Sequence, residues 1–483
     1  MAKIKTLCSA LLVLGLTIFG LTVGGLSIRA AAQTANDTPA DTAPAPAFGQ
    51  NAPILNPENP PVTGLDEPGL SLKTSSRSFI SPALQVSESG DTNGQNLLTS
   101  NSGVESVTRV LGAFDLQQFW PKSDLFLEYL GGGAFYSNPS DVKQLQSAGM
   151  EAVTRWRTGQ VTLRDAFSYL PDGSFQSGFG GLPGLGLANG GGMGFGSGGG
   201  LPGSHLFGSG DAGAGVGNVR RLANTAILDA VQALNPVSAI TVAGGFSNAH
   251  FFDSSNFLVN SDELTIEGGY SHLFNRHDQI GAVYAFQLFQ FPQYTGGQVY
   301  IHILNVRYSH TISGKLSLIV GVGPQYTELE VGGYSSRWSP SARVQLRYVV
   351  GRGSLVASFE KFTSAGSGLF AGANVDAARL GYTRPLGRTY EFYGDLSFSY
   401  NTPLQSGAGI NADNFYNGAA GVVLRKHMGR SFDLFGSYRF GELALGTATN
   451  AGACVPGDGC GRISQRQVGT VGLEWHPKPT RIE

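Results

Sequence analysis

Residues that could carry out catalysis are few in this sequence, and their spacing does not suit it. The eight histidines are His205, His250, His272, His277, His302, His310, His427 and His476. None of them has the spacing of a metal-binding motif. A hydrolase needs a serine beside a histidine, but an extended chain turns Ser309 and His310 to opposite faces, and Ser313 falls in a turn. We therefore expect no enzymatic activity, no metal site and no cofactor.

Two cysteines have a spacing that suits a disulfide. Cys454 and Cys460 lie in the segment ACVPGDGC, and no histidine or further cysteine lies nearby in the sequence to complete a metal site. In an oxidising compartment such a pair is expected to form a small loop disulfide. The glycine-rich run at 173–217 contains no lysine, which a phosphate-binding loop requires. We assign no nucleotide chemistry to this run.

The remaining polar chemistry is a set of charged side chains that alternate with apolar ones. Thirteen of them share one face of successive extended segments: Glu128, Arg164, Glu267, Arg307, Arg343, Arg347, Glu360, Arg379, Glu391, Asp395, Asp433, Arg439 and Glu474. Six are arginines and seven are acids, so their charges nearly balance. A dry protein core could not hold them, because each buried charge needs a partner. These residues predict the wall of a polar lumen.

Strands with a two-residue period must carry these charges. In TYEFYGDLSFSY (389–400), Tyr390, Phe392 and Phe398 share one face, whereas Glu391 and Asp395 share the other. Short polar turns recur at 120–124, 157–160, 235–238, 275–278, 312–315, 350–354, 385–389 and 427–431. Longer, irregular connections alternate with them, for example 251–263, 328–340, 363–375 and 446–462. Such an alternation of short and long connections is typical of an outer-membrane β-barrel.

The turns also set the number of strands. Eight turns pair sixteen strands between 105 and 445. A closing segment at 463–476 and an earlier one at 77–89 bring the number to about eighteen, with sixteen as the alternative. The segment at 218–234 also suits a helix, and we interpret it as a strand. The sequence therefore predicts an all-β fold, a transmembrane antiparallel up-and-down barrel with long outer loops and short periplasmic turns.

Large aromatic residues mark the predicted edge of the membrane. A few residues before short turns or near the end of the last strand, the apolar face carries Trp156, Tyr270, Tyr308, Tyr348, Tyr382 and Trp475. Aromatic residues that recur at one depth are expected at a membrane interface. The alternative is the general enrichment of aromatic residues in strands. We expect the apolar face to contact lipid and the charged face to line the lumen.

The N-terminal region predicts export. Lys3 and Lys5 precede an apolar run, and Ala30 to Ala32 offer a cleavage site, so residues 1–32 are interpreted as a signal peptide cleaved near Ala32. A membrane anchor is the alternative. Residues 33–76, rich in proline and alanine, are expected to form a disordered periplasmic tether. The barrel is expected over 77–477, followed by a polar tail at 478–483. The net charge of −2 gives no reason to expect nucleic acid as a partner.

The sequence resembles porin-like outer-membrane β-barrel proteins of the acidobacterial type. The resemblance lies in SDLFLEYLGGGAFYS, WRTGQVTLRDAFSYLPDGSF, the glycine-rich run and RHDQIGAVYAFQLFQFP, and it covers roughly residues 77–477. It implies a barrel in the outer membrane, and because the functions of these proteins are largely unassigned, it implies no site residues. The segment QRQVGTVGLEWHP resembles the closing strand that barrel-assembly machinery recognises, although the polar tail HPKPTRIE replaces a terminal aromatic residue.

These features favour a porin-like channel for passive diffusion of small polar solutes. One alternative is an export channel for surface polysaccharide, which would need a periplasmic partner that the tether could contact. Another is a plugged structural or adhesive surface barrel. Outer-membrane lipid and the barrel-assembly machinery are the other expected partners. The glycine-rich loop is expected either to enter the pore or cap the outer surface, or to extend into solvent, because its apolar residues are numerous while its glycines are costly to order.

Overall fold

The computed structural model describes residues 60–65, 78–93, 103–137, 140–170, 220–252, 258–294, 297–330, 334–365, 370–404, 414–446 and 463–482. All of them belong to the unit Pro53–Glu483. The predicted signal peptide, the glycine-rich loop and the two cysteines of the predicted disulfide lie outside the described residues. The described part of the chain contains no α-helix with the length and apolar character needed to cross a membrane.

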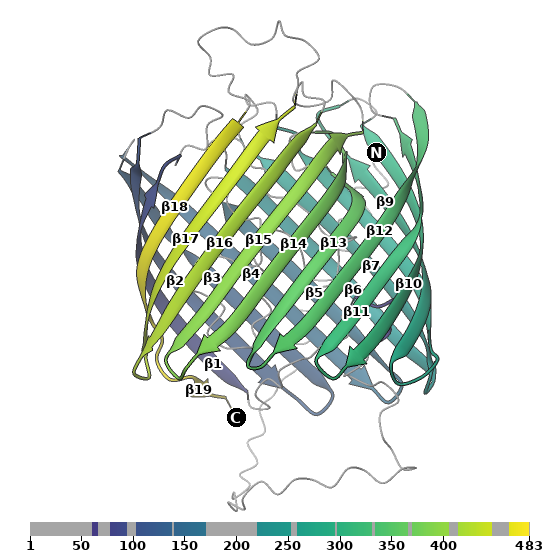
Figure 1. Cartoon of the computed structure of the whole chain (residues 1–483), viewed down its shortest axis with the longest axis horizontal. Coiled ribbons are helices and arrows are strands. Elements are labelled where there is room, and N and C mark those ends of the chain that lie inside the picture. Colours follow the sequence, from purple (N-terminus) through teal and green to yellow (C-terminus); the bar gives the residue numbers. More distant parts are fainter. Residues whose placement is uncertain are drawn as a thin grey trace, which may run out of the picture. The chain divides into compact units, whose positions relative to one another are not determined.

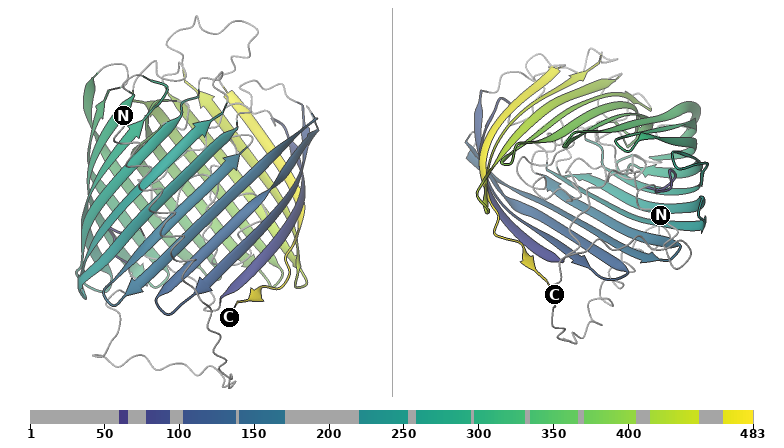
Figure 2. Two further views of the ribbon diagram at one scale, coloured as in Figure 1. Left: turned by 180° about the vertical axis from the view of Figure 1, so that it is seen from behind. Right: turned by 60° about the horizontal axis from the view of Figure 1, so that its bottom comes forward.

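The described residues form one closed antiparallel sheet of eighteen long strands (Figures 1 and 2). The strands are β1 (Phe79–Asp91), β2 (Glu105–Phe119), β3 (Ser123–Ser137), β4 (Ser140–Trp156), β5 (Gly159–Leu170), β6 (Arg221–Asn235), β7 (Ser238–Phe251), β8 (Ser261–Leu273), β9 (Asp278–Gln290), β10 (Gln298–Ser313), β11 (Leu316–Leu329), β12 (Ser335–Val350), β13 (Gly353–Ser364), β14 (Ala373–Leu386), β15 (Tyr390–Pro403), β16 (Phe415–Met428), β17 (Phe432–Leu445) and β18 (Ile463–Trp475). A two-residue strand, β19 (Thr480–Arg481), pairs with the start of β1.

Each strand pairs with the next one along the chain, and β18 pairs with β1 to close the barrel. The prediction of eighteen strands is confirmed, and the alternative of sixteen is wrong because both β1 and β18 belong to the ladder. The segment expected at 218–234 is strand β6, as predicted. The strands have 12 to 17 residues. Each is long enough to cross a membrane, since a tilted strand needs about 9–11 residues.

The short connections lie where the sequence places them. All eight predicted turns join consecutive strands at one rim of the barrel, the lower rim in Figure 1. Gly351, Gly387 and Gly429 have positive φ angles of 64°, 77° and 81° in three of these turns. Backbone in this region favours glycine, because other residues would bring Cβ against the chain.

Two connections at the opposite rim are shorter than predicted. Only two residues separate Ser137 at the end of β3 from Ser140 at the start of β4. The loop expected at 328–340 is also largely absent, because β12 already starts at Ser335, which pairs with Leu329 of β11. Cross-strand pairing can extend a hairpin through residues whose composition suggests a loop.

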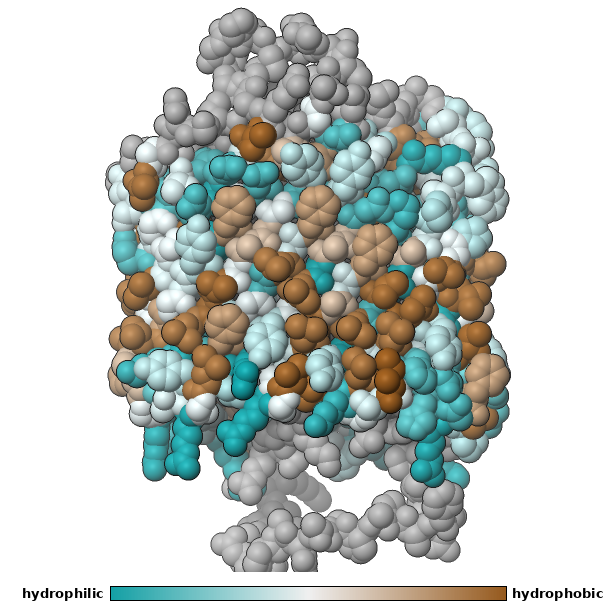
Figure 3. Space-filling model, in the orientation of Figure 1, coloured by the Kyte–Doolittle hydropathy of each residue, from teal (hydrophilic) through white to brown (hydrophobic). Residues whose placement is uncertain are grey.

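The two faces of the wall differ as the alternation predicts. In β15, Leu396 and Phe398 are 53% and 49% exposed, whereas Asp395 and Ser399 are both 4% exposed. Five of the six predicted interface aromatic residues are exposed on the outside, and the sixth, Tyr382, is half-buried. Figure 3 shows apolar side chains spread over this outer wall and hydrophilic ones gathered at the rim of the short turns. The outside of the barrel is therefore suited to lipid.

Candidate functional site: the inner wall of the barrel

The predicted lumen residues lie on the strand faces opposite the exposed apolar side chains. Twelve of the thirteen are next in sequence to a large hydrophobic residue that is exposed on the outside of the barrel. Arg307, for example, lies between Val306 and Tyr308, and Asp433 lies between Phe432 and Leu434. Arg164 lacks such a neighbour, but it is buried and forms ion pairs with two other strands. The inner wall thus contains many charges, most of which the ladder brings into pairs.

One group of paired charges spans β8 to β13. Arg307 on β10 lies 3.6 Å from Glu267 on β8, and Arg343 on β12 lies 3.5 Å from Glu360 on β13. Gly321 on β11 stands opposite both arginines in the register, and a Cβ there would lie 3.3 Å from Arg307 Cγ. The absence of a side chain on β11 gives the arginines room to lie along the wall.

A second pair crosses a strand in the same way. Arg439 Nη2 on β17 lies 3.7 Å from Asp395 Oδ1 on β15. Gly421 on the intervening strand β16 is opposite both residues in the register. A Cβ at Gly421 would lie 2.6 Å from Asp395 Oδ1 and 3.4 Å from Arg439 Nε. A glycine at this point is therefore required for the two charges to meet.

A third group lies near the short turns and contains an arginine that the sequence analysis missed. Arg425 on β16 is 3.6 Å from Asp433 on β17 and 3.4 Å from Glu474 on β18. His427 Nδ1 is 2.8 Å from Asp433 Oδ1, and His476 Nε2 is 3.4 Å from Asp433 Oδ2. Arg425 follows the exposed Leu424, so strict alternation along β16 would have identified it.

Arg164 also has partners that were not identified from the sequence. Its Nε donates to Glu151 Oε2 and its Nη1 donates to Asp229 Oδ1, both at 2.8 Å. The three residues come from β4, β5 and β6, and all are buried. By contrast, Arg379 and Glu391 lie on the inner face without an ion pair to any other described residue.

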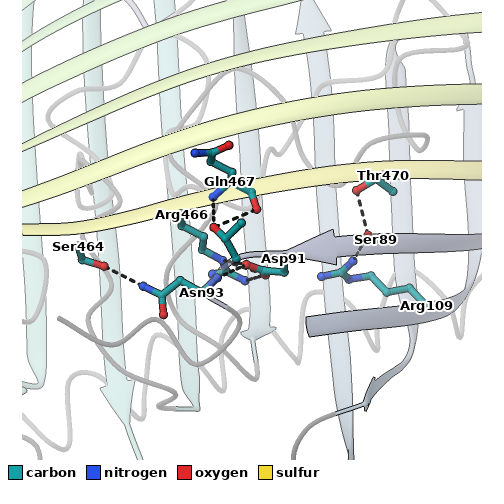
Figure 4. A network of polar contacts seen from close by, with 9 residues as sticks. Ser89, Asp91, Asn93, Arg109, Ser464, Arg466, Gln467 and Thr470 are labelled. Carbon is teal, nitrogen blue, oxygen red and sulfur yellow. Dashed lines mark hydrogen bonds and ion pairs between the residues drawn. The ribbon is translucent and has the colours of Figure 1, made fainter. Parts of the chain in front are cut away.

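The seam between the first and last strands has its own polar network (Figure 4). Arg466 on β18 donates from Nη2 to Asp91 Oδ2 at 2.6 Å and from Nε to Asp91 Oδ1 at 3.1 Å. Asn93 Nδ2 donates to Ser464 Oγ at 3.1 Å. Ser89 Oγ lies 2.9 Å from Thr470 Oγ1. These contacts join residues more than 370 positions apart, so they act directly on closure of the barrel.

Part of the inner wall is apolar, a feature that the prediction of a polar lumen did not include. Alternate residues of β9 and β10, including Phe289, Val299, Ile301 and Ile303, face inward and are buried. They form one cluster with Leu329 of β11 and with Ala365, Ala371 and Leu404 of the connections β13–β14 and β15–β16. The apolar pattern of β9 and β10 on both faces was visible in the sequence, but only packing within the lumen explains the inner face.

Six residues of the predicted tether also lie in this interior. Val62, Thr63 and Leu65 are buried, and Thr63 contacts the inner wall of β7 and β10. The sequence predicts a disordered tether over residues 33–76, and the burial of residues 60–65 differs from that prediction. The burial of these residues against a glycine-containing wall could not be read from a proline-rich segment alone.

His302 and His310, the two histidines weighed for catalysis, contact no serine among the described residues, whereas His272 Nδ1 lies 3.0 Å from Ser238 Oγ near the rim of the short turns. His302 Nδ1 contacts Tyr284 Oη at 2.8 Å on the outer face, and His310 Nδ1 contacts Asp278 Oδ1 at 2.7 Å. Ser309 is buried on the inner face, opposite to His310 on the strand. Within the described ranges no group of three His, Cys, Asp or Glu residues could hold a metal ion.

The geometry defines a class of protein, the closed antiparallel β-barrel with an apolar outside and a largely polar inside. No protein-family model and no curated protein match the sequence. Three solved structures from Pseudomonas aeruginosa are similar: OpdL (9% identity, TM-score 0.40), OccK5, also called OpdH (11%, 0.39), and OccK2, also called OpdF, in complex with glucuronate (9%, 0.39). They cover 83%, 85% and 83% of this chain, and 98%, 100% and 99% of their own chains.

Proposed function

We propose that this protein is a porin-like channel of the bacterial outer membrane, through which small polar solutes diffuse passively. The observation that carries the proposal is the two-faced wall. Exposed Leu396 and Phe398 alternate with buried Asp395 and Ser399 on a strand long enough to span a bilayer. An apolar outside with polar groups inside is the arrangement that lets a barrel cross a membrane and conduct polar solutes.

The inner charges suit a channel of weak ion selectivity. Arginines and acids alternate around the wall and neutralise one another in pairs such as Arg307–Glu267 and Arg439–Asp395. Paired charges create little net field across the lumen, whereas rings of one sign select for ions of the other sign. We infer that neutral and singly charged solutes pass without strong discrimination by sign.

We infer the location and partners from the same features. The apolar belt requires lipid around it, and β18, with alternating Val471, Leu473 and Trp475 on its exposed face, suits recognition by the barrel-assembly machinery. Export through a signal peptide cleaved near Ala32, membership of the acidobacterial type of porin-like barrels and a periplasmic partner for the segment 33–76 are parts of this proposal. Protein sequencing of the mature N-terminus tests the first of them.

Conductance of the refolded protein in a planar bilayer tests the channel. We expect discrete steps of current from protein fractions that migrate as the compact, heat-modifiable form of a closed barrel. Unfolded fractions of the same preparation should give no such steps. Swelling of proteoliposomes in neutral sugars of increasing size should then show a size limit. Replacement of Arg343 by Gln leaves Glu360 without its ion-pair partner. It should shift the reversal potential in a salt gradient in the direction of greater cation selectivity. The proposal would be overturned if well-folded barrels inserted into the bilayer gave no current.

A plugged structural or adhesive barrel is the second candidate, and two observations favour it. The apolar cluster around Phe289 and Ile301 fills part of the lumen, and residues 60–65 lie beside it, with Leu65 inside the cluster. The same bilayer experiment separates the two candidates, because a plugged barrel folds but does not conduct. An export channel for surface polysaccharide would conduct as well, and it would need a periplasmic partner. Affinity capture with the folded barrel, from extracts of its own cells, would identify that partner.

A further inference from the structure

A tight turn in residues 60–65 presents two side chains to the inner wall. The segment reads Pro-Pro-Val-Thr-Gly-Leu. Gly64 N donates to Pro61 O at 2.8 Å, which closes a β-turn with Val62 and Thr63 at its tip. Thr63 is fully buried, and Val62 and Leu65 are nearly so. Burial of a turn tip to this degree requires a matching recess in the wall.

Two glycines provide that recess. Gly269 on β8 and Gly281 on β9 belong to the inner face, because their neighbours Tyr270 and Ala282 are exposed on the outside. A Cβ on Gly269 would lie 2.7 Å from Thr63 Cβ, and a Cβ on Gly281 would lie 2.3 Å from Thr63 Cγ2. Any side chain at these positions would therefore collide with Thr63. We call the recess formed by these two glycines the glycine notch.

Polar groups around the glycine notch bind the backbone and hydroxyl of the turn. Thr241 Oγ1 on β7 lies 2.9 Å from Thr63 Oγ1 and 3.2 Å from Thr63 O. Arg307 Nη1 on β10 donates to Thr63 O at 3.4 Å. Gln279 Oε1 on β9 accepts a hydrogen bond from Val62 N at 2.7 Å. Three strands thus provide hydrogen-bond partners to the buried turn, and β8 adds Gly269 to the same site.

The glycine notch lies close to the rim of the short turns. Thr241 is the fourth residue of β7, which starts at Ser238, and Gly281 is the fourth residue of β9, which starts at Asp278. Figure 2 shows the short purple segment against the teal strands of this wall. Leu65 continues from the turn into the apolar cluster of the lumen. The segment therefore extends along the inner wall from near the short-turn rim.

We propose that the glycine notch is a peptide-binding site whose ligand is residues 60–65 of the same chain, and that the docked segment narrows the channel at its short-turn end. The narrowing rests on the proposed channel function, but the docking does not. Recognition follows from shape at the two glycines and from hydrogen bonds to a turn. The site therefore selects a small β-branched residue whose backbone carbonyl can accept hydrogen bonds from the wall.

Cross-linking tests the docking independently of conductance. In a chain in which the native cysteines are replaced by serine, the variant Thr63→Cys/Thr241→Cys should form a disulfide on mild oxidation, detected by mass spectrometry of linked peptides. The matched control is Thr63→Cys/Ser87→Cys, because Ser87 is also buried on the inner wall but belongs to β1. A disulfide only in the first variant supports docking. No disulfide in either, or equal yields in both, would overturn it.

Displacement of the segment tests the narrowing. Gly269→Val should fill the glycine notch, release the segment and at least double the single-channel conductance. Gly268→Val is the matched control, since a Cβ at Gly268 meets nothing within 4 Å. A second variant, Val62→Ser/Thr63→Gly/Leu65→Ser, leaves the barrel wall intact and should have the same effect even if Gly269→Val does not fold.

The outcomes separate this inference from the channel function on which it partly rests. Raised conductance in both displaced variants, with a wild-type value for Gly268→Val, supports the narrowing. Wild-type conductance from the displaced variants would show that the docked segment does not obstruct the pore. If the cross-link forms but the wild-type protein and all variants are silent, docking stands and the proposed channel is wrong.

Discussion

Removal of one partner from the buried ion pair at the barrel seam should destabilise the fold strongly. The side chains of Arg466 and Asp91 are 3% and 0% exposed, and two nitrogen atoms of Arg466 contact the carboxylate. Arg466→Met removes the cation and leaves a buried carboxylate. Loss of one member of a buried pair typically costs about 3–5 kcal/mol. Because Asn93 N also donates to Asp91 Oδ1 at 3.0 Å, we expect the lower value, about 3 kcal/mol.

The free energy of unfolding can be measured by urea titration of the refolded protein in lipid vesicles, followed by heat-modifiable migration. Arg155→Met is the matched control, because Arg155 pairs with Asp124 at the barrel rim with its own side chain 49% exposed. An exposed pair contributes at most about 1 kcal/mol.

A double variant tests the physical reason for the loss. Asp91→Leu/Arg466→Met removes both charges, so it should recover most of the stability that Arg466→Met loses. The reasoning is refuted if Arg466→Met costs no more than Arg155→Met, or if the double variant is as unstable as the sum of its single variants.

Three further predictions concern topology, the outer face and the paired charges. In a cysteine-free background on whole cells, Tyr334→Cys should react with an impermeant thiol reagent and Gly314→Cys should not. The reverse labelling pattern would show that the barrel has the opposite orientation in the membrane. Leu396→Arg should lower the free energy of unfolding by about 2–4 kcal/mol in lipid, because the side chain faces the bilayer, whereas Leu396→Met should not, and equal stability would place this face away from lipid. Gly421→Ala should cost about 1–3 kcal/mol by overpacking against the carboxylate on the adjacent strand, while Gly418→Ala, where a Cβ meets nothing within 4 Å, serves as its control in the same urea titration.

The strands, their turns and the two faces of the wall could be predicted from the sequence because all three depend on local patterns. The two-residue period of TYEFYGDLSFSY fixes which side chains share a face, whatever the strand pairs with. Turns such as that at Gly429 need residues that tolerate positive φ. A barrel of this kind has an even number of strands. This requirement led to the prediction of β1 and β18 as its first and last strands.

Contacts between strands depended on the register of the closed ladder, which no local pattern encodes. Asp395 and Arg439 meet only because Gly421 falls between them on the intervening strand. Asp91 and Arg466 are 375 residues apart and meet only because the last strand returns to the first. The connection at 328–340 was likewise decided by pairing, since β12 extends along β11 through residues with the composition of a loop.

The interior was the least predictable part, because what fills a lumen is decided by which surfaces are brought together in three dimensions. By itself the sequence determined that charges face inward and that the outside is apolar. Only the tertiary structure placed Thr63 against Gly269 and Gly281 and gathered Phe289 and Ile301 into an inner apolar cluster. The physical reason is that alternation fixes the direction of a side chain, whereas its partner depends on strand order, register and the curvature that closes the barrel.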